Sequence, residues 1–125
     1  MTLEEILKLA NEWETSATSA AIRYAKFTSE ACGIVISQGE IIKYYIPSEE
    51  AATVGFKFMG KGRRVPPKSK AAEAAFGTAP RKVLGKEATS DEWFSERVQT
   101  RTIWEESFAL GYTGTVLTLL ALESE

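Results

Sequence analysis

The stretch Gly111-Tyr-Thr-Gly-Thr-Val-Leu-Thr-Leu-Leu-Ala-Leu122 decides the fold, because it is apolar on both of the faces that a β-strand would present. Side chains of a strand alternate between its two faces. Val116 and Leu120 would lie on one face, and Leu117 and Leu119 on the other. Strands with two apolar faces are buried between two layers. We therefore expect this stretch to form a central strand that is covered on both sides.

The residues just before this stretch predict a second strand. Between residues 97 and 105, Val98 and Trp104 belong to one alternating set of positions, while Arg97 and Glu105 belong to the other. Such alternation is typical of a strand with one buried face and one wet face. We expect Trp104 to contribute to the core.

Two further β-rich runs predict a hairpin nearer the N-terminus. They cover residues 32–37 and 41–46, and they surround the turn signal Gln38-Gly39. Pro47 should end the second run, because proline has no amide hydrogen to donate to a strand ladder. The period of the apolar residues in this part of the chain is 2, which distinguishes it from the residues before it.

Capping signals predict two helices at the N-terminus. Thr2 and Glu5 form a T-x-x-E capping box ahead of apolar residues at helical spacing. Ser16 is the expected cap of a second helix, over about residues 17–27. The same T-x-x-E pattern recurs at residues 89–92 and predicts a helical turn there. Two helices around a short turn are typical of a helix-turn-helix, although this turn has no glycine.

The middle of the chain is patterned less regularly. Residues 54–59 are compatible with a short strand, and residues 60–67 with an exposed loop, because adjacent prolines exclude both a helix and a central strand. Ser69 is the expected cap of a short helix over residues 70–76, which Gly77 would close.

The composition removes most catalytic chemistry. The chain contains no histidine and a single cysteine, Cys32. The commonest general base near neutral pH is therefore missing, and so are Ser-His-Asp triads and zinc sites built from histidine. We expect no catalytic residue, no metal site and no cofactor. Cys32 begins an apolar strand, where a thiol usually acts as a small buried hydrophobe.

Targeting and membrane signals are missing from the sequence. No apolar run approaches the roughly 20 residues needed to span a bilayer. The first residues lack the basic start and apolar stretch of a signal peptide. One cysteine cannot form an internal disulfide. We expect a cytoplasmic location and no membrane partner.

Positive charge gathers between residues 57 and 86. This segment carries nine lysines and arginines against Glu73 alone, a net charge of +8, while six cations and sixteen anions elsewhere give −10. Two interpretations are open. The segregation can mark an anionic partner, or it can reflect a solvated basic loop.

Six residues are candidates for contact with a nucleic acid or a protein partner. They lie on the expected second helix or in the basic loop: Ser19, Arg23, Lys26, Arg63, Arg64 and Lys68. Such cationic and hydroxyl side chains bind DNA phosphates. The alternative is a helical hairpin packed on the sheet or on a neighbouring domain, since two cations are few for a DNA-reading helix.

Two other motifs have simpler explanations. Gly55–Lys61 matches most of a phosphate-binding G-x-x-x-x-G-K loop, but Gly62 stands where Ser or Thr would hold Mg²⁺. Residues 63–67 will not continue as the helix that such a loop needs. Glutamates are adjacent at 49–50 and 105–106, and neighbours on a strand point to opposite faces. They are therefore not paired catalytic carboxylates.

Four aromatic residues are candidate ligand-binding residues: Phe56, Phe58, Trp93 and Trp104. Sites for small molecules are mostly apolar and aromatic. The alternative is that these side chains supply core area alone.

A family resemblance lies in the residues Leu9-Ala-Asn-Glu-Trp-Glu-Thr-Ser-Ala-Thr-Ser-Ala-Ala-Ile-Arg-Tyr24 and Gly33-Ile-Val-Ile-Ser-Gln-Gly-Glu40. They resemble the region that follows the metal-binding helix in ImmA/IrrE-type metallopeptidases, and Tyr112–Leu120 is similar to the closing segment of that family. Ser19 and Arg23 match the family pattern in the second helix. The resemblance implies a helix-turn-helix segment and a GAF-like sensor domain, in stress-response or mobile-element regulators that cleave a repressor. The zinc-binding H-E-x-x-H helix has no counterpart here, so no catalytic residue is carried over.

These observations predict an α+β fold, with an N-terminal two-helix segment followed by an antiparallel sheet with flanking short helices, similar to GAF or PAS domains. The helix-turn-helix-like hairpin would cover residues 1–28 and the sensor-like domain residues 29–125. The expected function is that of a non-catalytic regulatory domain that binds a small molecule or a protein partner. The first alternative is a DNA-associated transcriptional regulator, and the second is an enzyme that uses carboxylates or Cys32. A homodimer is compatible with each.

Overall fold

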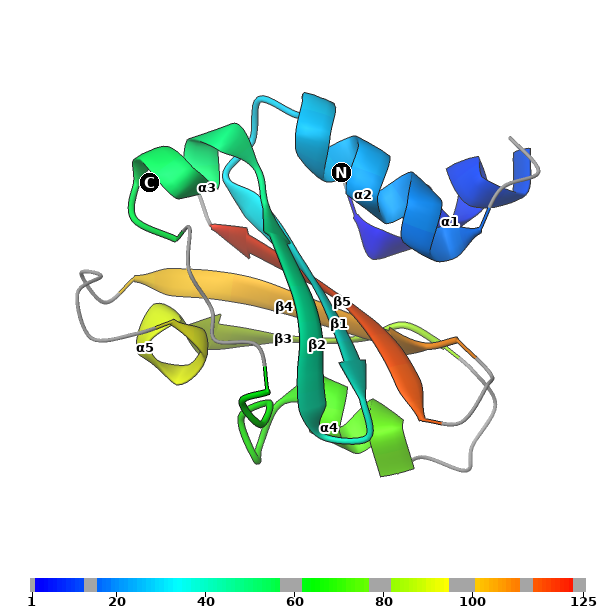
Figure 1. Ribbon diagram of the computed structural model, residues 1–125, viewed down its shortest axis with the longest axis vertical. Helices are drawn as coiled ribbons and strands as arrows, with labels where there is room; N and C mark the ends of the chain where they lie inside the picture. Colours follow the sequence, from blue (N-terminus) through cyan, green and yellow to red (C-terminus); the bar gives the residue numbers. More distant parts are fainter. Residues whose placement is uncertain are drawn as a thin grey trace.

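Figure 1 shows the chain in a computed structural model, which describes residues 2–12, 16–56, 62–76, 82–94, 101–110 and 114–122. The strands form one antiparallel sheet of order β2-β1-β5-β4-β3. Their bounds are β1 Cys32–Gln38, β2 Ile41–Pro47, β3 Leu84–Thr89, β4 Thr102–Ala109 and β5 Thr115–Leu122. The stretch that ends at Leu122 thus supplies the middle strand of the sheet, as its two apolar faces predict.

Helices lie on both sides of this sheet (Figure 1). Their bounds are α1 Leu3–Glu12, α2 Ala17–Phe27, α3 Glu49–Thr53, α4 Lys70–Phe76 and α5 Ser90–Trp93. The prediction of an α+β fold with two N-terminal helices, an antiparallel sheet and flanking short helices is confirmed. The division into domains at residue 28 stays a prediction.

We call the side of the sheet that α1 and α2 cover the α1 face. Its cluster joins Leu3 and Ile6 of α1 to Ile34 of β1 and to Leu117 and Leu119 of β5. All of these side chains are buried, and all are large aliphatic groups. Full burial of one such side chain contributes about 1.5–3 kcal/mol. The N-terminal helices are therefore held to the sheet by ordinary hydrophobic packing.

We call the opposite side the α4 face, because α4 lies near its centre. Its cluster joins Val116 and Leu120 of β5 to Trp93 of α5, Phe56, and alanines of α3 and α4. β5 therefore packs against a separate hydrophobic cluster on each face, as a central strand does. The helical elements of this face, α3, α4 and α5, are short.

Local side-chain caps explain where several helices begin. The Thr2 hydroxyl accepts from the Glu5 amide at 3.2 Å, and the Glu5 carboxylate accepts from the Thr2 amide at 3.0 Å. Ser16 accepts from the amide of Ser19 at 3.0 Å, which caps α2. The T-x-x-E box at residues 89–92 likewise forms at the start of α5. These three predictions are confirmed.

One side chain of α2 departs from the expectation. The apolar spacing of this helix includes Phe27, yet Phe27 is 80% exposed at the C-terminal end of α2. The buried contacts of α2 come from Ala20, Ala21 and Ala25. These small side chains let the helix lie close to the sheet, while its last residue extends past the packed layer.

The prediction that Trp104 contributes to the core is wrong, because β4 buries the other set of alternating positions. Ile103 and Glu105 are buried on the α4 face, whereas Trp104 is 38% exposed. The Trp104 ring lies on the α1 face over Gly85 of β3, where a Cβ would come within 3.0 Å of its Cζ2 atom. The α4 face takes Ile103 as its apolar contact, and the alternation of the strand then fixes Glu105 beside it. Val98 lies outside the described residues.

The middle of the chain also corrects the sequence interpretation. Residues 49–53 form α3, which Ser48 caps at 3.2 Å, and Val54 with Gly55 forms a turn rather than a strand. The rest of the expected strand and of the phosphate-loop motif, residues 57–61, lies outside the described residues.

The segment before α4 is not simply an exposed loop. The amide of Ile42 donates to the carbonyl of Arg63 at 2.8 Å, and the amide of Gly62 donates to the carbonyl of Ile42 at 2.9 Å. Val65 is fully buried in the cluster of the α4 face. Residues 62–65 therefore lie beside the start of β2 and pair with it through backbone hydrogen bonds.

Two glycines are required by geometry in the β1–β2 hairpin. Gly39 has a φ of 57° in the turn, a conformation that glycine adopts without steric cost. At Gly33, a Cβ would lie 2.5 Å from Cε1 of Tyr45. The Tyr45 ring crosses β1 at this point, donates its hydroxyl hydrogen to the carbonyl of Phe56, and meets the Phe94 ring edge-on at 5.8 Å.

Candidate functional site

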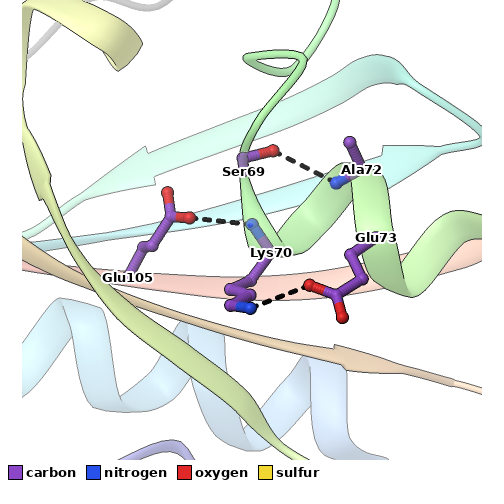
Figure 2. Close-up of polar contacts among 5 residues, drawn as sticks. All are labelled: Ser69, Lys70, Ala72, Glu73 and Glu105. Carbon is purple, nitrogen blue, oxygen red and sulfur yellow. Dashed lines mark hydrogen bonds and ion pairs between the residues drawn. The ribbon is translucent and has the colours of Figure 1, made fainter.

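The most unusual group in the described residues is the carboxylate of Glu105, which is fully buried on the α4 face. Its Oε1 atom accepts a hydrogen bond from the backbone amide of Lys70 at 2.8 Å, and its Oε2 atom accepts one from the indole nitrogen of Trp93 at 2.5 Å. Figure 2 shows the carboxylate reaching from β4 to the first residue of α4. One side chain thus connects β4, α4 and α5.

The first turn of α4 provides the rest of this arrangement (Figure 2). The Ser69 hydroxyl caps the helix by accepting from the amide of Ala72 at 3.1 Å, which confirms the predicted cap. The Lys70 ammonium pairs with the Glu73 carboxylate at 2.9 Å on the outer side of the helix. The Lys70 side chain therefore pairs with Glu73, and its backbone amide is the group that binds Glu105.

Small side chains form the contact between α4 and the sheet. Ala71, Ala72 and Ala74 are the buried residues of α4. The two strands that α4 contacts, β4 and β5, carry the hydroxyls of Ser107 and Thr118 on the same face, where they hydrogen-bond to each other at 2.8 Å and are both fully buried. The layer between α4 and the sheet therefore contains methyl groups, hydroxyls and one carboxylate beside the larger side chains of Val116 and Leu120.

A further buried hydroxyl on the α4 face belongs to Ser37 of β1. It belongs to the α4 face, because it is paired with Val116 and follows Val35 by two residues. Its hydroxyl is fully buried and has no hydrogen-bond partner within the described part of the chain. Buried hydroxyls usually have a partner, so this one has unused bonding capacity.

Burial dominates the electrostatics of Glu105. Desolvation raises the pKa of this carboxyl above its usual value, since a low-dielectric environment disfavours the charged form. The hydrogen bonds from Lys70 and Trp93 and the charge of Lys86 oppose this rise, whereas Glu92 adds to it. Both of these donors, a backbone amide and an indole, are neutral.

The next residue, Glu106, repeats this arrangement on the α1 face. It is 8% exposed, and its Oε1 atom accepts from the amide of Leu3, the first residue of α1, at a long distance of 3.4 Å. Burial raises the pKa of Glu106 as well, while hydrogen bonds from Leu3 and Trp104 lower it. The two adjacent carboxylates point to opposite faces, as predicted for neighbours on a strand.

The structure separates the four aromatic candidates for ligand binding. Phe56 and Trp93 are both buried in the cluster of the α4 face. Phe56 stacks on Phe94 with ring centroids 4.4 Å apart. Trp104 lies on the opposite face, and Phe58 is outside the described residues. The α4 face therefore unites two of the four, and both belong to its core.

The six candidate contact residues fall into two separate groups. Ser19, Arg23 and Lys26 are exposed at spacings of four and three residues, so they share one stripe of α2. The other three, Arg63, Arg64 and Lys68, are exposed beside the start of β2 and before α4. Figure 1 shows α2 and this segment at opposite ends of the molecule.

The second basic group is ordered by backbone pairing with β2, and Arg64 also pairs with Glu40 at 3.1 Å. Both charged groups of that pair reach solvent, so the pair adds little to stability. Because the two groups of cations are separate, a single partner could not contact all six residues through a small surface.

The chemistry of the remaining candidates is simple. Cys32 is a buried free thiol, and burial raises its pKa to about 11, which disfavours the reactive thiolate. Among the described residues, no group of three potential ligands is placed to hold a metal ion. None of the helices in the described ranges has the length and apolar character needed to cross a bilayer.

Sequence reasoning missed the role of Glu105 and that of the hydroxyls under α4. Glu105 was assigned to the polar set of its strand, and no local pattern marks a carboxylate as buried. Three features taken together would have indicated that Glu105 is buried. They are the central strand beside β4, a short alanine-rich helix, and a tryptophan whose indole needs a hydrogen-bond acceptor. No model of a known protein family matches this chain, and no curated protein matches it.

Proposed function

We propose that this chain is a non-catalytic regulatory domain that binds a small molecule on the α4 face of its sheet. The observation that carries the proposal is the layer under α4, where alanines face hydroxyls and the buried carboxylate of Glu105. Ligand sites combine apolar walls with a few polar groups that fix orientation. Trp93 and Phe56 provide apolar walls beside these polar groups.

The attachment of α4 supports the proposal energetically. Its buried contacts are alanine methyl groups, and each such group contributes about 0.8 kcal/mol when it is removed from water. The hydrogen bond from Lys70 to Glu105 is a polar contact that a ligand can replace. A short helix attached in this way is easier to displace than α1, which buries Leu3 and Ile6.

The resemblance to ImmA/IrrE-type regulators supports the same class of function and remains a proposal. An H-E-x-x-H sequence encoded upstream in the same reading frame would support membership in that family. An unrelated upstream sequence would count against it, without affecting the test of ligand binding.

Ligand binding is tested by thermal unfolding of the purified protein against a panel of small metabolites. A ligand present at a hundred times its dissociation constant stabilises the folded state by about 2.7 kcal/mol, so its effect is measurable. We expect the shift to be reduced in Thr118→Val, which removes a buried hydroxyl of the layer with little change in volume, and to be retained in Glu87→Gln on the exposed side of β3. A panel without any stabilising compound contradicts the proposal.

One observation favours a second candidate function, contact with DNA through α2. Ser19, Arg23 and Lys26 share an exposed stripe of this helix, as a helix that contacts phosphates requires. Binding of this kind weakens steeply with salt. Charge reversal in Arg23→Glu/Lys26→Glu should abolish binding to duplex DNA, and the same change at Arg63 and Arg64 tests the separate basic segment. Equal affinity of all three proteins would exclude both surfaces.

A further inference from the structure

Glu105 and Glu106 are consecutive residues of β4, and each one binds the first residue of a helix on a different face of the sheet. Glu105 accepts from the amide of Lys70 in α4 at 2.8 Å, and Glu106 accepts from the amide of Leu3 in α1 at 3.4 Å. Both carboxylates are buried. A negative charge near the start of a helix is stabilising, because unpaired amides and the helix dipole meet it there.

The strand makes these two contacts interdependent. The two residues are consecutive on one strand, so their side chains leave the same short piece of backbone toward opposite faces of the sheet. β4 is paired on both sides, with β3 and with β5. A shift of this part of β4 within the sheet therefore moves the backbones of Glu105 and Glu106 together, and it changes the contacts with α4 and with α1 at the same time.

We infer that Glu105 and Glu106 couple α4 to α1 through β4, so that displacement of α4 on one face loosens the start of α1 on the other. The coupling rests on the proposed function for its regulatory meaning, because a ligand under α4 would displace that helix. It would carry the state of the α4 face to the N-terminal helices. Coupling between sites is reciprocal, so a change at Glu106 also loosens α4.

Because each carboxylate is buried, its stability in the folded protein depends on the hydrogen-bond donors around it. A buried carboxylate that loses one donor is destabilised, since its charge is then less compensated. Trp93 is the second donor to Glu105, at 2.5 Å. Removing the indole nitrogen at this position therefore disturbs Glu105 from the α5 side and changes no residue of α1 or α4, while Trp93 shares a hydrophobic cluster with the alanines of α4 and none with α1.

Amide hydrogen exchange of the full chain without ligand tests this inference. In Trp93→Phe, we expect exchange to become about fivefold to tenfold faster in the first turns of both α4 and α1, which is the lower end of the range typical of coupled sites. Amides of β1 and β5 should exchange at wild-type rates, which separates coupling from a general loss of stability. Glu105→Gln is the second variant, and it should give the same pattern if Trp93→Phe does not fold.

Control variants distinguish the proposed coupling from other effects of substitution. Glu87→Gln is the same substitution on the exposed side of β3, and it should leave both helices unchanged. Ser107→Ala perturbs β4 two residues from Glu105 without removing either carboxylate, and it should not accelerate exchange in α1 more than in β1 and β5. Glu106→Gln should accelerate exchange in α4.

Two results would overturn the inference. One is faster exchange in α4 with unchanged exchange in α1, and the other is an equal acceleration throughout the chain. Because no ligand is present, either result leaves the ligand screen as an independent test, and a screen without hits leaves the exchange result intact.

Discussion

The helices α1 and α4, on opposite faces of the sheet, are held to it by different side chains. On the α1 face, Leu3 and Ile6 pack against Ile34, Leu117 and Leu119, which are all large and aliphatic. At the centre of the α4 face, alanines of α4 lie over the hydroxyls of β4 and β5 and the carboxylate of Glu105. Aromatic side chains are gathered toward one side of that face.

This difference indicates which helix can be displaced from the sheet at the lower cost in free energy. Large aliphatic contacts are lost only at a high cost, because each buried side chain contributes about 1.5–3 kcal/mol. A layer of methyl groups and hydrogen bonds can exchange its partners at a lower cost, since another donor or acceptor can replace the lost one. The contacts of α1 should therefore add more to the stability of the domain than those of α4, and α4 should carry the adaptable contacts.

The largest effect should come from a cavity on the α1 face. Ile6→Ala should lower the free energy of unfolding by about 2–5 kcal/mol, because Ile6 is fully buried and its loss leaves a void. Urea unfolding measures the change. Ala72→Gly on the α4 face is the matched deletion, and it should cost roughly 1 kcal/mol, mainly from helix propensity and one lost methyl group. Equal costs would break the comparison between the two faces.

A smaller effect should follow from crowding the aromatic side of the α4 face. Gly33→Ala should lower the free energy of unfolding by about 1–3 kcal/mol, because the new Cβ would lie 2.5 Å from the Tyr45 ring. The ring must move, and its contacts with Phe56 and Phe94 are then disturbed. Near-ultraviolet circular dichroism should report the moved ring. Gly33→Ala combined with Tyr45→Leu should recover part of the stability, and no recovery would contradict this explanation.

The pH dependence of stability should distinguish the two carboxylates. The pKa of Glu105 and that of Glu106 are raised above the usual value of 4.5, mainly by desolvation. The folded state then holds these protons more tightly than the unfolded state does. Stability should therefore fall as the pH rises from about 4.5 through the raised pKa values.

Substitution of each carboxylate measures its part of this slope. Glu105→Gln should flatten the fall in stability more than Glu106→Gln, because Glu105 is fully buried and Glu106 is 8% exposed. Urea unfolding across the acidic to neutral range gives the slopes, with Glu87→Gln as the exposed control. An unchanged slope in Glu105→Gln would show that this carboxyl titrates normally in the folded protein.

Much of the α1 face could be predicted from the sequence, because its signals are local. The capping pair Thr2 and Glu5, the cap Ser16 and the helical spacing before residue 28 all act within one or two turns. The central strand was equally predictable, since a run with two apolar faces fits only between two layers. Phe27 is the exception, because its exposure depends on where the sheet ends beneath α2.

The α4 face could be predicted only in part, because its contacts join distant residues. Ser69 and the helix after it follow from a local cap, but the pairing of Lys70 with Glu105 spans 35 residues. β3, with the sequence Leu84–Thr89, has few strand-forming residues and is recognised only through its pairing with β4. Glu105 itself has the pattern of a wet position, and its burial depends on donors from α4 and α5.

The last comparison separates two buried serines of the α4 face. Ser107→Ala removes half of the hydrogen bond between Ser107 and Thr118 and leaves the Thr118 hydroxyl buried without this partner, so it should cost about 1–3 kcal/mol. Ser37→Ala removes a buried hydroxyl that has no partner within the described residues, so stability should stay within about 1 kcal/mol of wild type or rise. Urea unfolding of both variants in parallel provides the comparison.

Whether Ser37→Ala raises or lowers the free energy of unfolding bears on whether the α4 face binds a ligand. If Ser37→Ala is neutral or stabilising, the hydroxyl is retained at a cost to the folded protein, and natural proteins keep such groups where function requires them. The same variant should then bind any ligand of the α4 face more weakly than Glu87→Gln does. A clear loss of stability in Ser37→Ala would instead mean that this hydroxyl has a structural partner, such as a buried water, and the α4 face would lose one of the polar groups that we assign to ligand binding.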